Sequence, residues 1–343
     1  MKKILAVAIA TAFAAPAFAA TSNVDVYGKL HVSVSVFDDH NDTLYNDTQI
    51  SSNASRFGIK GSEDLGGGLA AIWQFESGMN LDEQTGTLAS RNSFVGLKGG
   101  FGTALVGNHD TPLKGVGRAV DLFGDTMADS RNVLGGGSDT RAKNVVAYMS
   151  PDFTGLSFAA AYSTDLGTSN NNGDAADASV YNLSATYKNG PLYLGLGYGD
   201  GDGHELAGVG KHIRAAAGFT MGNLKFVGQY DKLDDDNTVL PLAQAGDFDA
   251  WMLGAAYTMG NIVLKANYMD GEYDDAATGY DVEQFTIGAD YNLSKRTAVY
   301  VLYADGKNIT LGSGGGSSDR IAGAAVAGDD DVSVISLGMT HTF

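Results

Sequence analysis

The chain ends in the stretch Val332-Ser-Val-Ile-Ser-Leu-Gly-Met-Thr-His-Thr-Phe343, in which apolar and polar residues alternate up to a terminal aromatic residue. A period of two places successive side chains on opposite faces of a β-strand. The other end carries Lys2-Lys3, an apolar run from Ile4 to Ala15 and the small-residue site Ala17-Phe18-Ala19. These features predict a secretory signal peptide over residues 1–19, cleaved after Ala19, so the mature, exported chain is 20–343.

The same alternation recurs along most of the mature chain and predicts an all-β protein. Several apolar faces end in Tyr or Trp, as expected where strands meet a lipid headgroup layer. Two segments, near residues 103–108 and 298–304, alternate poorly, so their facing is left open. Clear examples of alternation are residues 24–36, 181–188, 224–231, 251–258 and 262–269.

The connections between these segments fall into two alternating length classes, seven short and eight long, and therefore separate sixteen strands. The four prolines of the mature chain all lie in connections, as required where no strand has a free edge. An even number of antiparallel strands with tight turns at one end and long loops at the other predicts a transmembrane β-barrel. The long connections cover roughly residues 37–53, 79–90, 110–142, 165–178, 200–211, 231–249, 270–281 and 305–331.

Charge is distributed unevenly over this predicted barrel. Removal of Lys2 and Lys3 leaves 20 basic and 40 acidic residues, a formal charge of −20. The long connections hold 33 of the acidic residues but only 8 Lys and Arg, a surplus of 25 negative charges. Cations on strands should face the lumen, because a Lys or Arg on the lipid face costs about 2–4 kcal/mol at the midplane. Sixteen strands leave an aqueous channel.

Several motifs resemble those of the general porins of Gram-negative outer membranes. They are Tyr27-Gly-Lys29, the stretch 55–61, the stretch 63–69, the stretch 91–98 and the ending Gly338-Met-Thr-His-Thr-Phe343. The resemblance implies a sixteen-stranded barrel with an inward-folded third loop. It also implies a homotrimer in outer-membrane lipid and lipopolysaccharide, and passive diffusion of small hydrophilic solutes and ions. Phe343, with His341, would be the assembly signal that the barrel-assembly machinery reads.

The resemblance also assigns a pore constriction, and the longest connection is indeed the third. Asp121-Leu-Phe-Gly-Asp-Thr126 resembles the family's acidic motif, so Asp121 and Asp125 are the expected acidic side. The motif lacks the usual proline at its start and has Val120 there instead. An ordinary salt bridge inside the lumen is the alternative for each basic residue. The expected basic side, matched motif by motif, is Lys29, Arg56, Arg91 and Arg141, with Lys60 as a further candidate nearer the periplasmic rim.

These observations predict an outer-membrane porin with a mild preference for cations, based on the loop charge and on Asp121 and Asp125. The alternatives are a substrate-specific channel, or an adhesin or receptor that uses the long acidic loops. No histidine lies in a nucleophile or metal-binding spacing, so neither an enzyme nor a metal site is expected. Glycine clusters lack the strand-to-helix context and the lysine of a phosphate loop, so no cofactor and no nucleic-acid partner are expected.

Overall fold

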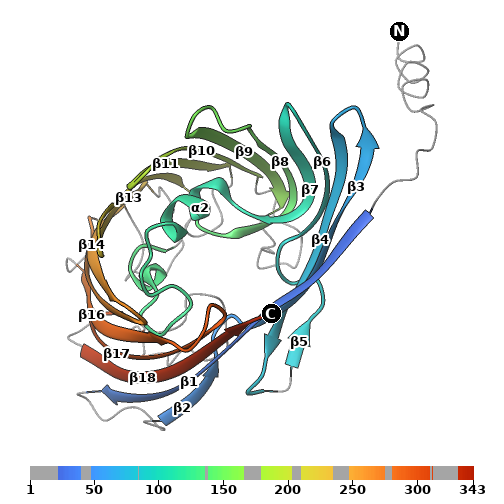
Figure 1. Ribbon diagram of the computed structural model, residues 1–343. Helices are drawn as coiled ribbons and strands as arrows, with labels where there is room; N and C mark the ends of the chain where they lie inside the picture. The colour runs from blue at the N-terminus through green and yellow to red at the C-terminus, as the bar shows by residue number, and fades with distance from the viewer. Residues whose placement is uncertain are drawn as a thin grey trace, which may run out of the picture.

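The chain folds into a closed antiparallel β-barrel with a segment of chain lying inside the ring of strands (Figure 1). The structure is a computed structural model, and it describes residues 22–39, 48–83, 85–135, 138–165, 179–202, 210–234, 247–274, 280–309, 311 and 331–343. The predicted signal peptide, residues 1–19, lies outside the described residues. The predicted fold class is confirmed.

Eighteen strand segments occupy sixteen positions in the barrel. Segments β2 and β3 both pair with β1, and β5 and β6 both pair with β4, so each of these two pairs fills one position. Two short helices, α2 (Pro112–Arg118) and η1 (Ser130–Asn132), lie in the third loop. The segments are β1 (Ser22–Asp39), β2 (Thr48–Ser52), β3 (Arg56–Gly66), β4 (Leu69–Asn80), β5 (Thr85–Thr87), β6 (Ser93–Gly99), β7 (Gly102–Asp110), β8 (Arg141–Met149), β9 (Leu156–Asp165), β10 (Ser179–Asn189), β11 (Leu192–Asp202), β12 (Lys211–Met221), β13 (Leu224–Asp234), β14 (Phe248–Met259), β15 (Ile262–Tyr273), β16 (Tyr280–Asn292), β17 (Thr297–Lys307) and β18 (Asp331–Thr342).

The first and last strands close the barrel. Strand β1 pairs with β18 from Lys29 opposite Thr342 to Asp39 opposite Val332. Beyond that ladder, Gly28 and Phe343 exchange two backbone hydrogen bonds of 3.1 and 3.2 Å. The Phe343 ring lies over Gly28, where any added side chain would collide with it. The terminal residue therefore completes the seam between the two ends of the chain.

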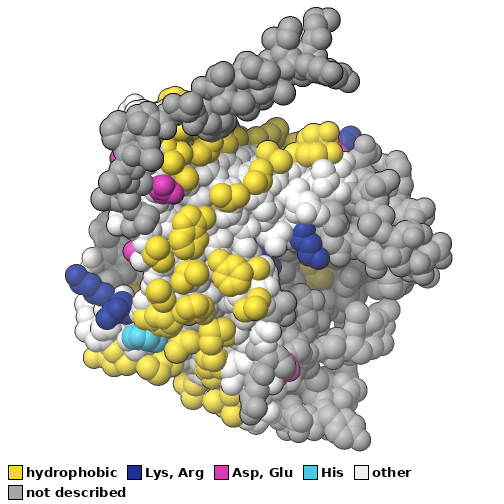
Figure 2. All heavy atoms as spheres, turned by 90° about the vertical axis from the view of Figure 1, so that its right-hand side faces the viewer, with side chains coloured by type: hydrophobic (Ala, Val, Ile, Leu, Met, Phe, Trp, Pro, Cys, Tyr) yellow, Lys and Arg dark blue, Asp and Glu magenta, His cyan; other side chains and the backbone are white. Residues whose placement is uncertain are grey.

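The alternation in the sequence separates an apolar outer face from the inner wall. On β14, Leu253 is 62% exposed on the outside, whereas its neighbour Met252 is fully buried on the inside. Figure 2 shows hydrophobic side chains gathered over the outer face of the barrel. The structure also shows how the two poorly alternating segments, 103–108 and 298–304, are oriented. Val106 and Val301 face outward, whereas Leu105 and Leu302 face inward. Among the described residues, no helix is both long and apolar enough to cross a membrane.

The third loop (residues 111–140) packs against one side of the inner wall and makes a core inside the barrel. Its apolar residues Val116, Val120, Val133 and Leu134 form one cluster with buried side chains of β12 to β16. Phe123, Met127 and Ala128 form a second cluster with buried side chains, mainly of β17 and β18. The wall residues of these two clusters include Ala216, Val227, Met252, Met269, Val282, Leu302 and Val334. Helix α2 also contacts β9 to β12, so the loop is held over the wall from β9 to β18 and leaves much of the wall from β1 to β8 uncovered.

Candidate functional site

The third loop begins with a capped helix that also ties its two ends together. Pro112 occupies the first turn of α2, where its fixed φ suits a helix and its missing N–H is not needed. The hydroxyl of Thr111 accepts a hydrogen bond from the Lys114 backbone at 3.4 Å. The same hydroxyl donates to the Ser138 carbonyl at 2.6 Å. The start and the end of the loop therefore lie next to each other at the wall.

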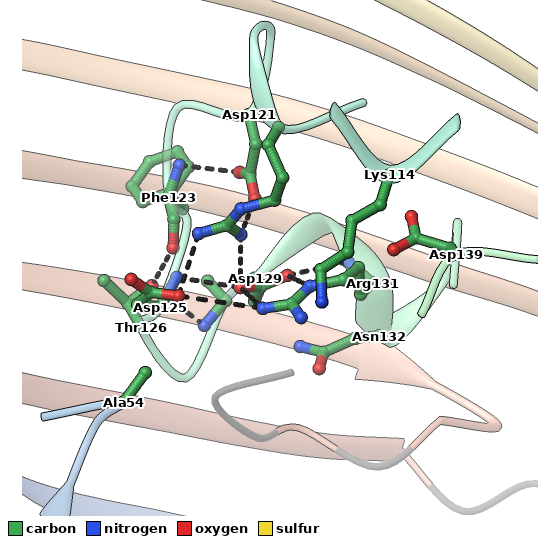
Figure 3. A network of polar contacts seen from close by, with 12 residues as sticks. Ala54, Lys114, Asp121, Phe123, Asp125, Thr126, Asp129, Arg131, Asn132 and Asp139 are labelled. Carbon is green, nitrogen blue, oxygen red and sulfur yellow. Dashed lines mark hydrogen bonds and ion pairs between the residues drawn. The ribbon is translucent and has the colours of Figure 1, made fainter. Parts of the chain in front are cut away.

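Arg118, the last residue of α2, organises the tip of the loop, whose residues Asp121, Asp125 and Asp129 are labelled in Figure 3. Its guanidinium nitrogens lie 3.1 Å from Asp121, 2.8 Å from Asp125 and 2.9 Å from Asp129. Arg131 adds a two-pronged contact to the Asp129 carboxylate, with distances of 2.9 and 2.8 Å. Charge-assisted contacts of this kind are strong and directional. They fix which carboxylate of the tip points across the lumen.

Asp125 is the carboxylate that reaches the opposite wall. It has a φ of 63°, a left-handed conformation that Asp adopts more readily than most residues. Its Oδ2 lies 3.1 Å from Nζ of Lys29 on β1 and 3.6 Å from Nη1 of Arg56 on β3. One predicted acidic residue and two predicted basic residues therefore meet, and they span the lumen between the loop and the wall.

A β-bulge between β2 and β3 aims Arg56 at this contact. Ala54 has a φ of 53°, and its carbonyl accepts a hydrogen bond of 3.2 Å from Nη1 of Arg56. The Ser55 hydroxyl accepts from the His31 backbone N–H at 2.9 Å and donates to the His31 carbonyl at 3.0 Å. A bulge bends a strand and re-aims its side chains, and here it holds the guanidinium toward the loop.

Two further predicted basic residues lie beside this contact, each with an acidic partner. Nε of Arg91 lies 2.6 Å from Oε1 of Glu76. Nη2 of Arg141 lies 3.0 Å from Oδ1 of Asp110, and its Nε donates to the Asn92 side chain at 2.8 Å. These residues extend the basic row along the wall from β3 to β8.

The loop and the wall enclose a cavity of about 430 Å³, which we call the waist. Its lining holds six cationic and three acidic side chains, a net charge of +3. The side chains of Arg118 and Arg56 are 29% and 26% exposed, whereas those of Asp121 and Asp129 are fully buried. Solvent in the waist therefore meets mostly guanidinium and ammonium groups. The charged lining residues are Arg56, Arg91, Lys114, Arg118, Arg131, Arg141, Asp110, Asp125 and Asp139.

The three loop carboxylates differ in protonation behaviour. Burial opposes ionisation of Asp125, but the charges of Arg118, Lys29 and Arg56 outweigh it and hold the pKa of Asp125 well below its usual range. Burial, reinforced by the nearby charge of Asp129, raises the pKa of Asp121 to about 6, against the pull of Arg118. Asp125 is therefore a fixed charge, while Asp121 titrates in a mildly acidic range.

Three of the predicted constriction residues are not among the residues that line the waist: Lys29, Asp121 and Lys60. Lys29 still contacts the lining through Asp125. The Asp121 side chain is fully buried in the loop, where it accepts a hydrogen bond of 2.9 Å from the Phe123 backbone. Lys60 is exposed, and its ammonium lies 5.1 Å from the centre of the Tyr27 ring. At the closing seam, His341 lies 2.9 Å from the Thr297 hydroxyl. The assembly role assigned to Phe343 and His341 stays a prediction.

The sequence reasoning missed the cations that the third loop itself supplies. Arg118 and Arg131 were counted only as loop charges, although each stands two or three residues from an aspartate of the tip. For Arg118 and Asp121 that spacing is a usable signal, because side chains three residues apart meet on a helical turn. The two-residue spacing of Asp129 and Arg131 gives no such signal. Among the described residues, no group of three or more His, Asp or Glu side chains is placed to hold a metal ion.

A closed barrel with an apolar outer face and a charged, water-accessible waist is a channel-forming membrane protein. Residues 6–311 match the family of Gram-negative porins, so the chain belongs to that family and is an outer-membrane porin.

Curated relatives support this assignment. The major outer membrane protein P.IB of Neisseria meningitidis serogroup B is 32% identical over 324 residues, covering 88% of this chain and 92% of the relative. Outer membrane porin protein 32 of Delftia acidovorans is 29% identical over 364 residues and aligns along the whole of both chains. The solved anion-selective porin from Comamonas acidovorans is 27% identical, covers 94% of this chain and 100% of its own, and superposes with a TM-score of 0.74.

Proposed function

We propose that this porin is a diffusion channel for small hydrophilic solutes and ions that prefers anions over cations. The observation that carries the proposal is the inequality of accessible charge at the waist. Six cationic side chains line it against three acidic ones, and two of the acids of the loop tip are fully buried. Selectivity in a pore depends on its diameter and on the charges that line it.

This proposal reverses the mild cation preference expected from the acidic loops. At physiological salt the Debye length is about 8 Å, so distant loop charges are largely screened and charges at the narrowest point dominate. The solved relative with a TM-score of 0.74 is described as anion-selective, which agrees in sign. Asp125 contributes to the waist as the counter-charge that holds Lys29 and Arg56 in place.

Salt substitution in planar bilayers tests the preference. Single-channel conductance would be compared in potassium chloride, in a potassium salt of a bulky organic anion and in the chloride of a bulky organic cation. If anions carry most of the current, the bulky anion lowers conductance strongly and the bulky cation lowers it little. The opposite ranking would restore the cation preference.

We further propose a homotrimer, as the family resemblance implies. The same recordings test it, because a trimer inserts as one unit whose three pores close in three equal conductance steps. Cross-linking in detergent that yields only monomers, together with single-step closures, would exclude the trimer. Swelling of liposomes in isotonic solutions of neutral sugars would show whether uncharged hydrophilic solutes also pass.

A further inference from the structure

We propose that Arg214, a buried residue of β12 outside the waist, sets the width and the ion preference of the channel by fastening both ends of the third loop to the inner wall. In this role Arg214 is a positioning residue, because it touches the loop and not the solute. The inference rests on the proposed channel function and adds to it a residue that lies behind the waist and is paired with one of its lining residues, Asp139.

The contacts of the Arg214 guanidinium join three parts of the chain. Its side chain is fully buried, and its Nε donates to Oδ1 of Asp231 on the neighbouring strand β13 at 2.8 Å. Its Nη2 donates to the Leu134 carbonyl at 2.7 Å, and its Nη1 forms an ion pair with Asp139. Nη1 also lies 3.4 Å from the Leu113 carbonyl. One rigid fork therefore holds the first turn of α2 and the returning end of the loop together.

The surroundings of Arg214 are shaped to hold it. A Cβ atom on Gly117 would lie 2.5 Å from Nη1 of Arg214, so only glycine lets α2 approach this closely. Gln229 donates to Asp231 at 3.0 Å, and Nε2 of His212 lies 3.2 Å from the same carboxylate. Burying charges is costly unless they are paired and hydrogen-bonded, and this group satisfies both conditions around the guanidinium.

Other wall residues hold the loop at single stretches. Asn182 of β10 accepts from the Leu113 backbone N–H at 2.7 Å. Lys265 of β15 donates to the Leu122 carbonyl at 3.0 Å, and Gln284 of β16 donates to the Ala128 carbonyl at 3.1 Å. None of these three contacts joins the two ends of the loop. Loss of Arg214 should therefore detach both ends of the loop from β12 and β13, which the loss of any one of these three contacts would not do.

The position of α2 is transmitted directly to the waist. Arg118 ends this helix, and its guanidinium orients Asp125 at 2.8 Å. Asp125 in turn faces Lys29 and Arg56 across the lumen. A helix released from Arg214 no longer holds Arg118 and Asp125 in place against Lys29 and Arg56. The waist then widens, and its fixed charges no longer surround every passing ion.

The experiment uses the full-length exported protein and two substitutions, Arg214→Lys and Arg214→Met. The lysine variant keeps the buried charge but loses the fork, and the methionine variant loses both. Arg296→Lys is the matched control, because Arg296 lies in an exposed periplasmic turn. Barrel formation would be scored by heat-modifiable gel mobility, and single-channel conductance and zero-current potential would be measured on inserted channels.

A disulfide tether provides a rescue that a role in barrel stability alone would not predict. A Cβ atom on Gly197 of β11 would lie 3.3 Å from the Leu113 Cβ, close to the roughly 3.5–4.5 Å separation of a disulfide. The chain contains no cysteine, so Leu113→Cys with Gly197→Cys adds a single pair. In the Arg214→Met background, this pair should fasten α2 to the wall under oxidising conditions and release it after reduction.

We expect both Arg214 variants to conduct about twofold more per channel, with frequent partial closures and a zero-current potential nearer zero, because the waist is wider. The tether should restore wild-type values until reductant is added. Folded Arg214 variants with wild-type conductance and selectivity would overturn the inference. Failure of both variants to form barrels even with the tether would overturn it too, because Arg214 would then serve barrel folding. An absence of channels from the wild type would instead refute the proposed function.

Discussion

The half of the inner wall that the third loop covers differs in chemistry from the half that faces the waist. On the covered half, the inward positions Val227, Met252 and Met269 are apolar and buried against the loop. On the uncovered half, the inward positions carry charged groups such as Lys29 and Arg56. The comparison shows that inward positions carry solvent-accessible charges where water reaches the wall. Under the loop, inward positions are apolar or, as at Arg214 and Gln284, polar, buried and hydrogen-bonded. The loop turns part of the lumen into protein interior.

The two halves depend on each other. Packing against the covered half fixes the loop, and the loop then presents Arg118 and Asp125 to the uncovered half. Burying a Val or Met side chain contributes about 1.5–3 kcal/mol, so several such contacts offset much of the cost of ordering the loop. In the proposed function the charged half sets the ion preference, because its side chains face the water of the waist.

The largest effect is expected when the basic side of the waist is neutralised. The triple variant Arg56→Gln, Arg91→Gln and Arg141→Gln removes three of the six cations that line the waist and leaves its three acids. The net charge of the lining falls from +3 to 0. Reversal potentials should therefore show that the anion preference is lost, and single-channel currents should show a several-fold lower conductance for anions. Lys98→Gln, at the exposed end of β6 beside a short turn, is the control. If the triple variant kept its anion preference, the basic row would not determine the ion selectivity of the channel.

A second effect should distinguish the covered inner wall from the lipid-facing wall. Met252→Ala leaves a cavity beneath the loop and should destabilise its packing by about 2–5 kcal/mol. Its neighbour Leu253 is 62% exposed, so Leu253→Ala should cost much less because lipid refills the space. Thermal unfolding in detergent, with current noise as a second readout, checks the difference. Equal losses in both variants would mean that the loop adds no core.

A smaller effect is expected when the acidic side of the waist is changed alone. Asp125→Asn removes the counter-charge that lies 3.1 Å from Lys29 and 2.8 Å from Arg118. The net charge of the lining rises by one, so the zero-current potential should shift further toward anions. Glu63→Gln, at an exposed position of β3, supplies the matched loss of one negative charge outside the waist. A shift toward cations would contradict the placement of Asp125.

The smallest effect concerns pH. Burial and the charge of Asp129 raise the pKa of Asp121 to about 6, above that of the unfolded chain. The folded loop therefore binds more protons than the unfolded loop, and Asp121 adds to loop stability as the pH falls through about 6 toward 4. Protonation also removes one negative charge behind Arg118, so anion preference should rise slightly between pH 7.5 and pH 5. This rise should be absent in Asp121→Asn, and its persistence there would assign it to another group.

The barrel was predictable because alternation and connection length are local signals. Period-two patterns placed Leu253 outside, and motif resemblance placed Lys29, Arg56 and Asp125, which the structure brings together. The covered half of the wall was present in the sequence as apolar residues at inward positions, such as Met252. Alternation alone could not explain why these inward positions are apolar. The segment that covers them is the third loop, which lies more than a hundred residues away in the chain.

The interior of the loop was hidden from the sequence for the same reason. Asp121 and Asp125 belong to one motif, yet Arg118 buries the first while the second reaches the far wall. The Arg214 network joins β12, β13 and two stretches of the loop, and no local pattern marks those partners. Contacts between residues far apart in the chain determine which charged side chains face the water. They therefore determine the sign of the net charge that lines the waist.

The zero-current potential of the wild-type channel in a potassium chloride gradient tests the central claim most directly. The claim is that guanidinium and ammonium groups dominate the water-accessible lining of the waist. With the concentrated salt on one side, chloride should cross faster than potassium and leave that side positive relative to the dilute side. A potential of the opposite sign would show that the acidic residues control permeation, and would contradict this account of the waist.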